Sequence, residues 1–458
     1  MTVDLTTADE MLKIDYKDGL HDDINERVPI FSMFEREVND ESVEADVHRF
    51  AIKIAPSQNH RMYGTRSPAQ FARVDGEFVV KKVDVTYNIG YNPIRVSPDI
   101  VWRAANGDAA MINTLKEQLR DLREQQGCQL DRGLSTGNGH DVYFTVRTVP
   151  GSSPWTYGIE NYGGYSGEAL GLTVEVLNML NLWVNFSAPT VTSSTYATVR
   201  NGGAAGKITA SADTYGSETI TLDRQIVGAQ VGDVIFRSRD EAGGVQGTND
   251  GILGLVAGVD DFTDKDPYQT INSTDDAASS FQSRLIDASA VAISESLLNR
   301  LITIAQIRRG GGRNDGDAVR HVFVIHTINA NDFAQEFTTV NYAGSSTGRR
   351  QNYGVTEKGF KPKYGYHREY LAYNGIVFVD GHLCLRESTF LVNLDDAYLL
   401  HNGPAEGDFL SPAGGGPHVL RVPGTPLSEY VWANMAQLAF KRRNACNRLY
   451  NHTTPTYA

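Results

Sequence analysis

One long helical pattern constrains this chain more than any other feature of its sequence. Between Asn106 and Gly139, apolar residues recur every three or four positions, which places them on one face of a single α-helix. Asn106 is suited to begin this helix and Gly137-Asn138-Gly139 to end it. A helix of this length spans about 40 Å, which predicts a rod as long as a small domain is wide. The positions on the face are Ile112, Leu115, Leu119, Leu122, Gln126, Leu130 and Leu134.

Composition bounds the class of protein. The 458 residues are 41% hydrophobic and 21% charged, which is typical of a folded chain with two or three domains. No apolar run reaches the roughly 18 residues that a membrane helix needs, and the first residues do not resemble a secretion signal. We therefore expect no membrane partner. Cys128, Cys384 and Cys446 are far apart and form no metal motif, which predicts buried thiols in a reducing cytoplasm.

The net charge of −13 is unevenly distributed along the chain. The first 46 residues hold fourteen acidic and four basic residues, whereas residues 49–95 carry a net charge of +5. Two interpretations are open: two solvated surfaces that happen to differ, or complementary surfaces on neighbouring copies of the chain. The overall negative charge argues against a protein built to grip nucleic acid.

The segments before the helix predict an arm and a hairpin. Thr7 and Glu10 have the spacing of a capping box, and residues 28–34 form a dense apolar cluster without a period. That cluster must be buried, either in the chain's own core or elsewhere. Alternating apolar residues at 50–54 and 83–89 predict two strands. The polar stretch between these strands predicts a long β-hairpin whose tip projects from the body.

The composition changes after the helix. Residues 143–149 predict a strand, and residues 170–184 fit either a helix or a strand. From 185 to 276 the chain is rich in Thr, Ser, Gly, Val and Asp, with short strand patterns separated by turns, which indicates a small antiparallel barrel or sandwich. Those strand patterns lie at 190–200, 207–212, 218–222, 233–237 and 251–256.

The remaining third of the chain mixes a helix with strands. Residues 285–309 fit an amphipathic helix that ends with two arginines followed by glycine. A short helix is expected at 331–337. Apolar runs predict strands at 321–326, 375–380, 389–394, 397–400 and 430–440.

The end of the long helix resembles a known family. Leu130-Asp131-Arg132-Gly133-Leu134-Ser135-Thr136-Gly137-Asn138-Gly139, followed by Tyr157-Gly158-Ile159, is similar to the spine-helix ending of tailed-bacteriophage major capsid proteins with the Hong Kong 97-type fold. The segments before and after it follow the order of that family. Val231-Gly232-Asp233-Val234-Ile235-Phe236 resembles a phrase in the β-rich insertions that several such proteins carry.

The resemblance implies an α+β fold with a long spine helix, an extended β-hairpin loop and an inserted all-β domain. It also implies that the apolar cluster of the arm is buried against a neighbouring subunit and that the hairpin lies across the adjacent one. The expected units are an N-terminal arm (1–45), the extended β-hairpin loop (46–100), the spine helix and peripheral domain (101–184), the inserted β-rich domain (185–276), the axial domain with returning peripheral segments (277–427) and the C-terminal strand of the peripheral domain (428–458).

The function implied by the resemblance is structural. Copies of the chain would assemble into hexamers and pentamers of an icosahedral capsid that encloses double-stranded DNA without sequence specificity. Scaffolding, portal and decoration proteins are the further partners implied, with assembly in the bacterial host cytoplasm and a final location in the virion. Some members of the family crosslink a hairpin lysine to a distant asparagine. Lys53, Lys81 and Lys82 are available here, but no local feature marks a partner, so no crosslink is predicted.

Two alternatives remain, another virion protein of the tail or decoration type, and a serine hydrolase. The hydrolase interpretation rests on Ser346 in a G-x-S-x-G pattern, but no amphipathic helix follows it, so a polar loop is favoured. Residues 202–208 resemble a phosphate loop but lack the Ser or Thr after the lysine.

Metal sites are not predicted either. His321 and His326 are five residues apart and therefore point to opposite faces of a strand. The acidic turn at residues 260–266 lacks the glycine and terminal glutamate of a calcium loop, so a solvated turn is expected. We predict no catalytic, cofactor-binding or metal-binding residue and no cofactor.

Overall fold

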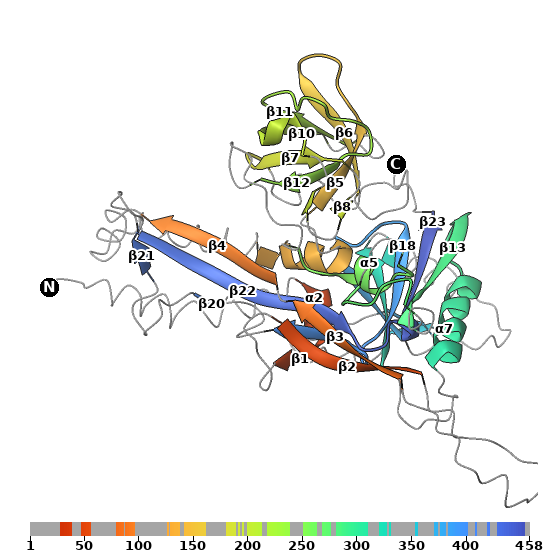
Figure 1. Ribbon diagram of the computed structural model, residues 1–458. Helices are drawn as coiled ribbons and strands as arrows, with labels where there is room; N and C mark the ends of the chain where they lie inside the picture. Colours follow the sequence, from red (N-terminus) through yellow and green to blue (C-terminus); the bar gives the residue numbers. More distant parts are fainter. Residues whose placement is uncertain are drawn as a thin grey trace, which may run out of the picture.

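The computed structural model describes the chain in segments between Val28 and Thr453. These segments are mostly β-strands, which form two sheets in a central body, a closed barrel and a two-stranded ribbon, as Figure 1 shows. The described residues are 28–38, 47–55, 79–86, 88–96, 126–127, 129–137, 142–161, 180–188, 191–192, 195–196, 199–212, 218–238, 251–262, 268–275, 281–309, 320–327, 329–330, 353–355, 371–373, 376–381, 383–401, 408–409, 419–421 and 428–453.

The first sheet of the body is organised around one long strand, β22 (Ser428–Phe440). The C-terminal part of β22 pairs with β19 inside the body, and its N-terminal part pairs with β4. The other strands of this sheet are β1 (Glu35–Val38), β4 (Asn88–Val96), β19 (Ala397–His401), β20 (Asp408–Phe409) and β21 (Val419–Arg421). The predicted strand at 430–440 is confirmed, and it is longer than its apolar run indicates.

The second sheet has seven strands in the order β13-β23-β18-β14-β17-β16-β15. Its central strand β14 is buried on both faces, because Val322 to Ile325 are each at most 1% exposed. An unbroken apolar run is what such a strand requires. The strands are β13 (Arg284–Val291), β14 (His321–His326), β15 (Tyr353–Val355), β16 (Leu371–Tyr373), β17 (Ile376–Gly381), β18 (Ser388–Asn393) and β23 (Asn447–His452).

Helix α7 (Glu295–Arg309) covers one face of this second sheet. Leu298, Leu301 and Ala305 lie on one side of the helix and pack in the same apolar cluster as sheet residues such as Phe323. The predicted end of the helix is confirmed, but the predicted start is wrong. Residues 284–291 form β13, because β23 supplies a parallel partner for them that no local pattern reveals.

The described end of the long helix covers residues 126–127 and 129–136. Gln126, Leu130 and Leu134 are buried, as the face predicts. Gly137 ends the helix, and its amide donates to the carbonyl oxygen of Gly133 at 3.1 Å. A Cβ atom at Gly137 would lie 2.2 Å from the carbonyl oxygens of Gly133 and Ile252, so close backbone packing requires glycine there.

The barrel is closed by six antiparallel strands in the order β10-β11-β6-β5-β12-β7. Two of them precede residue 185, so the expected start of the β-rich unit differs from the structure, and Val142 is its first strand residue. The strands are β5 (Val142–Thr148), β6 (Trp155–Asn161), β7 (Trp183–Ser187), β10 (Gly206–Ala212), β11 (Thr219–Leu222) and β12 (Val234–Arg237), with a small added pair β8 (Val191–Thr192) and β9 (Thr195–Tyr196) and the 3-10 turn η2 (Asn201–Gly203).

The segment after the barrel belongs to the body rather than to the β-rich unit. Residues 251–256, expected as a strand, lead into the short helix α5 (Leu255–Gly258). Leu255, Val256 and Ile271 are buried in the same core as β22 and β14. The unit expected to end at 276 therefore ends its barrel at β12. Among the described helices, none is long and apolar enough to cross a membrane.

Candidate assembly surfaces

The apolar cluster of the arm is buried in the chain's own core. Residues 29–33 form helix α2 (Pro29–Met33), and Ile30, Phe31 and Phe34 are fully buried among residues of both sheets. The implied burial of this cluster against a neighbouring subunit is therefore wrong. Large apolar side chains at this density must be buried, and the packing of α2 against β17 buries them within the same chain.

The predicted hairpin is confirmed at its base. Strands β2 (Val47–Ala55) and β3 (Val79–Thr86) pair antiparallel as a separate two-stranded sheet. Val83 and Val85 of β3 are buried in the body core, while Lys82 before them and Thr86 after them are exposed. The expected projecting tip lies outside the described residues. The alternation at 83–89 is not one strand, since β3 ends at Thr86 and β4 begins at Asn88.

A second ribbon leaves the body on another side. Strand β4 pairs with residues 428–436 of β22 along its whole length, and Figure 1 shows the two running out from the body together. Sequence reasoning missed this pairing because the partners are more than 330 residues apart. The only sequence signal was the length of the apolar run in β22, which exceeds what one compact sheet needs.

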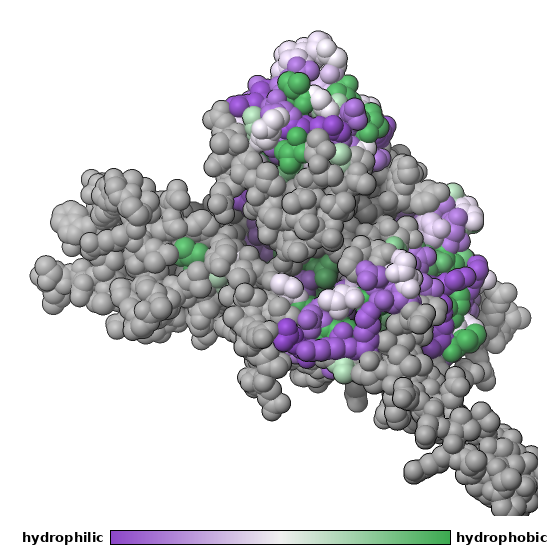
Figure 2. All heavy atoms as spheres, in the orientation of Figure 1, coloured by the Kyte–Doolittle hydropathy of each residue, from purple (hydrophilic) through white to green (hydrophobic). Residues whose placement is uncertain are grey.

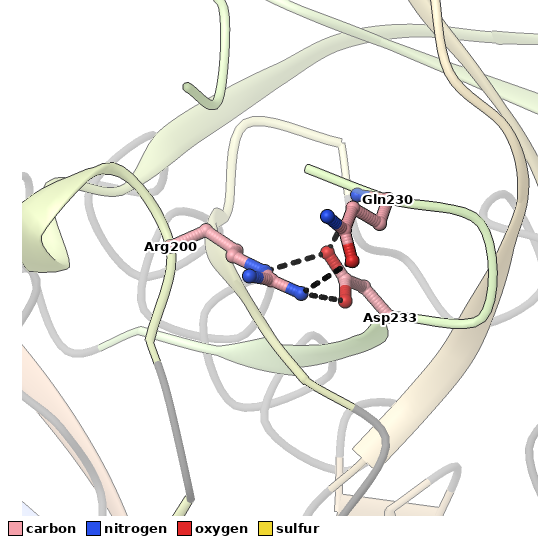
Figure 3. A network of polar contacts seen from close by, with 3 residues as sticks. All are labelled: Arg200, Gln230 and Asp233. Atoms are coloured by element: carbon pink, nitrogen blue, oxygen red, sulfur yellow. Dashed lines mark hydrogen bonds and ion pairs between the residues drawn. The ribbon is translucent and has the colours of Figure 1, made fainter. Parts of the chain in front are cut away.

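The barrel holds a polar network at the loop that leads into β12 (Figure 3). Arg200 donates two hydrogen bonds to the carboxylate of Asp233, from Nε at 2.9 Å and from Nη2 at 2.7 Å. The same carboxylate accepts the amide of Gln230 at 2.7 Å, and Arg200 Nη2 also reaches Gln230 Oε1 at 3.3 Å. Because Asp233 is fully buried, this two-pronged ion pair fixes the loop.

This network explains the phrase Val231 to Phe236. Gly232 adopts φ of 90°, which a residue with a side chain rarely does, and so turns the chain to bury Asp233. Val234, Ile235 and Phe236 then enter the barrel wall as β12. The residue types of the phrase thus encode a structural turn.

A buried carboxylate lies at the end of the long helix, where the chain passes into the barrel. Burial, opposed by a hydrogen bond from Ser135 and assisted by the charge of Asp380, raises the pKa of Asp131 to about 7. The Ser135 hydroxyl donates to Asp131 Oδ1 at 3.4 Å, and Cys384 Sγ lies 3.6 Å from that hydroxyl. Burial also raises the pKa of the Cys384 thiol far above its usual value, so this thiol stays protonated.

Another buried charge, Arg443, ties the C-terminal segment to the body core. Its side chain lies in the 3-10 turn η3 (Arg443–Ala445), is fully buried, and donates to the carbonyl oxygens of Ala257, Gly258 and Asp260. The guanidinium also lies 4.2 Å from the ring centre of Tyr268. Asp260 is fully buried beside it, so the expectation of a solvated acidic turn is wrong at that residue.

The remaining sequence candidates are not brought together. Ser346 lies outside the described residues, and residues 202–208 form the end of η2 and the start of β10. His326 is buried in β14, while His321 is half-buried at the start of the strand. Within the part of the chain that the structure describes, no three His, Cys, Asp or Glu side chains cluster as metal ligands. Cys384 and Cys446 are buried and unpaired by disulfide, as predicted, while Cys128 is outside that part.

The described part of the surface in Figure 2 has no single dominant apolar face. In Figure 2, hydrophobic residues of the described surface occur in small groups among hydrophilic ones, on the barrel and on the body alike. Val227 and Val231, in the loop that the polar network holds, are 62% and 68% exposed. Such scattered side chains are ordinary at a protein surface.

Comparisons with known proteins give matches among solved structures. No protein-family model matches the sequence, and no curated protein matches it. A cyanophage A-1(L) capsid asymmetric unit is 12% identical, with 93% of each chain covered and a TM-score of 0.49. The capsid of a native GTA particle is 7% identical over 93% of this chain and 91% of that one, with a TM-score of 0.41. A holo-SrpI encapsulin complex from Synechococcus elongatus PCC 7942 is 9% identical over 93% and 89%, with a TM-score of 0.38. Phage capsid structures are thus among those to which this chain is similar over nearly its whole length.

Proposed function

We propose that this chain is the structural subunit of a tailed-bacteriophage icosahedral capsid with the Hong Kong 97-type architecture. Copies assemble into hexamers and pentamers that enclose double-stranded DNA. The observation that carries the proposal is two projections that leave a well-packed body in different places, the β2–β3 ribbon and the β4–β22 pair, to which β20 and β21 add short strands. A two-stranded ribbon such as β2–β3 is marginally stable in water, so a protein that extends one is suited to neighbours that cover it.

The sequence resemblance supports the same proposal from independent residues. The Asp131-to-Gly139 ending belongs to a helix whose described part stops at the predicted glycine. The hairpin and the closing strand occupy the places in chain order that the family requires. An enzyme is not favoured, because the buried polar groups Asp131, Asp233 and Arg443 are engaged in structural contacts.

The proposal also assigns the parts of the chain. The extended loop (46–100) reaches neighbouring subunits, while residues 28–38 of the arm (1–45) belong to the subunit's own body. The spine helix and the β22 sheet form the peripheral domain, and the seven-stranded sheet forms the axial domain. The β-rich unit is taken from 142 to 238 rather than from 185 to 276, following the strands of the barrel. Scaffolding, portal and decoration proteins are the proposed partners, and the mature location is the virion capsid.

The direct test is electron microscopy of the chain expressed alone and together with a scaffolding protein from the same genome. Closed shells with hexamers and pentamers are the expected result. Tubes, or binding only to preformed shells, would instead identify a tail or decoration protein. Esterase activity that disappears in Ser346→Ala would favour the hydrolase alternative.

Deleting Gln58 to Val74 tests the role of the hairpin. Since β2 and β3 and the buried Val83 and Val85 are kept, the subunit should still fold, with a circular dichroism spectrum close to that of the intact chain. Closed shells should be lost, because the proposed contact with the next subunit is removed. Normal shells from the deleted chain would contradict the assignment of the hairpin.

A further inference from the structure

The base of the β2–β3 hairpin contacts one loop of the body, formed by residues 268–275. Tyr268 and Ile271 of this loop, on either side of the turn at 269–270, are both fully buried in the cluster that also holds Val83 and Val85. The backbones of Tyr268 and Ile271 pair with each other in both directions, at 3.0 and 2.9 Å. The loop is therefore fixed to the same core on which the hairpin lies.

The tip of this loop has an unfavourable backbone. Gln269 and Thr270 adopt φ of 48° and 66°, a region that residues with side chains, and β-branched ones above all, rarely occupy. Turns with two such residues normally use asparagine and glycine. Strained backbone persists where the surrounding structure enforces it, and it often occurs at functional sites. The conformation directs the Thr270 hydroxyl to the backbone amide of Asp84 in β3, at 3.5 Å.

A second contact joins the far end of the same loop to the hairpin. Lys81 of β3 forms an ion pair with Asp275, whose carboxylate also accepts the amide of Asn272 at 2.9 Å. The hydrogen bond from Lys81 lowers the pKa of Asp275. Both side chains are about one-third exposed, so solvent and salt weaken the pair, and it can open without unfolding the body.

We propose that the loop 268–275 is a salt-sensitive latch that holds the base of the β2–β3 hairpin in one direction relative to the body. The buried side chains of Val83 and Val85 fix the position of β3 on the body. The two latch contacts, from Thr270 and from Asp275, prevent the strand from rotating about these two anchored residues. A weak, exposed contact is suited to a hairpin whose direction is fixed in the isolated subunit and changes when neighbouring subunits bind to it. This role rests on the proposed function, but the latch itself is a property of the single chain.

Hydrogen exchange of the isolated full-length subunit, read on peptides covering β2 and β3, tests the latch. Lys81→Met and Asp275→Asn should each accelerate exchange there by about two- to fivefold, the change expected from losing one exposed ion pair. Lys82→Met is the matched control, because Lys82 is the exposed neighbour on the other face of the strand. Salt at about 1 M should accelerate exchange in the unchanged chain but not in Lys81→Met.

Two further variants separate the latch from a general loss of stability. The double variant Lys81→Asp with Asp275→Lys restores opposite charges and should recover most of the slow exchange. Thr270→Gly accepts the left-handed backbone and removes the hydroxyl, so it should loosen the hairpin while leaving the exchange of Tyr268 and Ile271 unchanged. Unchanged exchange in both single variants, or an equal effect of Lys82→Met, would overturn the proposal.

The exchange result is independent of shell formation. If the unchanged chain forms no shells, the proposed function fails while the exchange experiment still decides the latch. If shells form, Lys81→Met should yield severalfold fewer closed particles than Lys82→Met. Equal yields would overturn the assembly role of the latch.

Discussion

The barrel and the body of this protein are built from the chain in opposite ways. Among the described residues, the barrel draws its core from 143–235, with Leu383 as the one contribution from elsewhere. The main body core draws on segments spread from Val28 to Cys446, including the arm helix α2 and the hairpin strand β3. A core made from one contiguous stretch of sequence can be inserted or replaced as a unit. A core made from distant segments is complete only when all of these segments have folded together.

The two regions also handle buried charge differently. The barrel pairs Arg200 with Asp233 inside one unit, in a two-pronged contact. The body instead buries Arg443 against carbonyl groups from a segment about 185 residues earlier, and Asp131 against Ser135 and Cys384. Charge changes in the barrel should therefore act locally, while those in the body should act on the whole fold.

The largest expected effect is that of Arg443→Met. It removes three hydrogen bonds to buried carbonyl oxygens and should lower the free energy of unfolding by about 3–5 kcal/mol. Urea unfolding measures the loss, and hydrogen exchange should accelerate in both sheets but not in the barrel strands. Arg442→Met is the control, because Arg442 is largely exposed and its ion pair with Asp396 is long at 3.8 Å. Equal acceleration of hydrogen exchange in the barrel strands would show that the barrel is not independent of the body.

A smaller and local effect is expected from Asp233→Asn. The neutral amide leaves Arg200 without its buried counter-charge and should cost the barrel about 2 kcal/mol. Exchange should accelerate in β5, β7 and β12, while both body sheets keep their protection. Asp223→Asn serves as the comparison, since its ion pair with Arg224 is partly exposed at 3.3 Å. A loss of protection throughout the molecule would mean that the barrel is not a separate unit.

The smallest effect has the opposite sign and depends on pH. The folded chain holds a proton on Asp131 up to about pH 7, whereas the unfolded chain releases it near 4. The contribution of Asp131 to stability is therefore fully present below pH 4 and is lost as the pH rises to 7. Asp131→Asn removes this loss, so the stability of the variant relative to the unchanged chain should be greater at pH 8 than at pH 4.

Denaturant unfolding of both chains between pH 4 and pH 8 measures this difference. The comparison of the two chains is needed because His452 also makes stability depend on pH. Burial lowers the pKa of His452 to about 4, so the folded state loses stability as the pH falls from about 6.5, equally in both chains. A difference that does not grow with pH would show that Asp131 is ionised in the folded body.

Local sequence patterns were sufficient to predict an element where its hydrogen-bonding and packing partners lie within the same segment or the next one. Hairpin β2–β3, the buried run of β14 and the strands β10, β11 and β12 follow from alternation and turns, because each of these signals is read over a few residues. The same holds for the helix stop at Gly137 and for the buried thiols of Cys384 and Cys446.

Local patterns failed where a distant partner made the decision. Residues 284–291 fit a helical period but became β13 because β23 offers a parallel edge about 160 residues later. Asp260 lies in an acidic turn but is buried because Arg443 arrives beside it. The arm cluster could be buried in either of two places, and only the three-dimensional core showed room for it within the chain.

The sequence by itself determined the hairpin β2–β3, the buried strand β14, the strands β10, β11 and β12, and the need to bury the arm cluster, since periodicity and turn residues are read over a few neighbouring residues. Only the tertiary structure decided the pairing of β4 with β22, the start of the barrel at Val142 and the burial of Arg443. The physical reason is that a strand edge or a buried charge is satisfied by whichever group the fold brings near it, and nothing in the local sequence specifies that group.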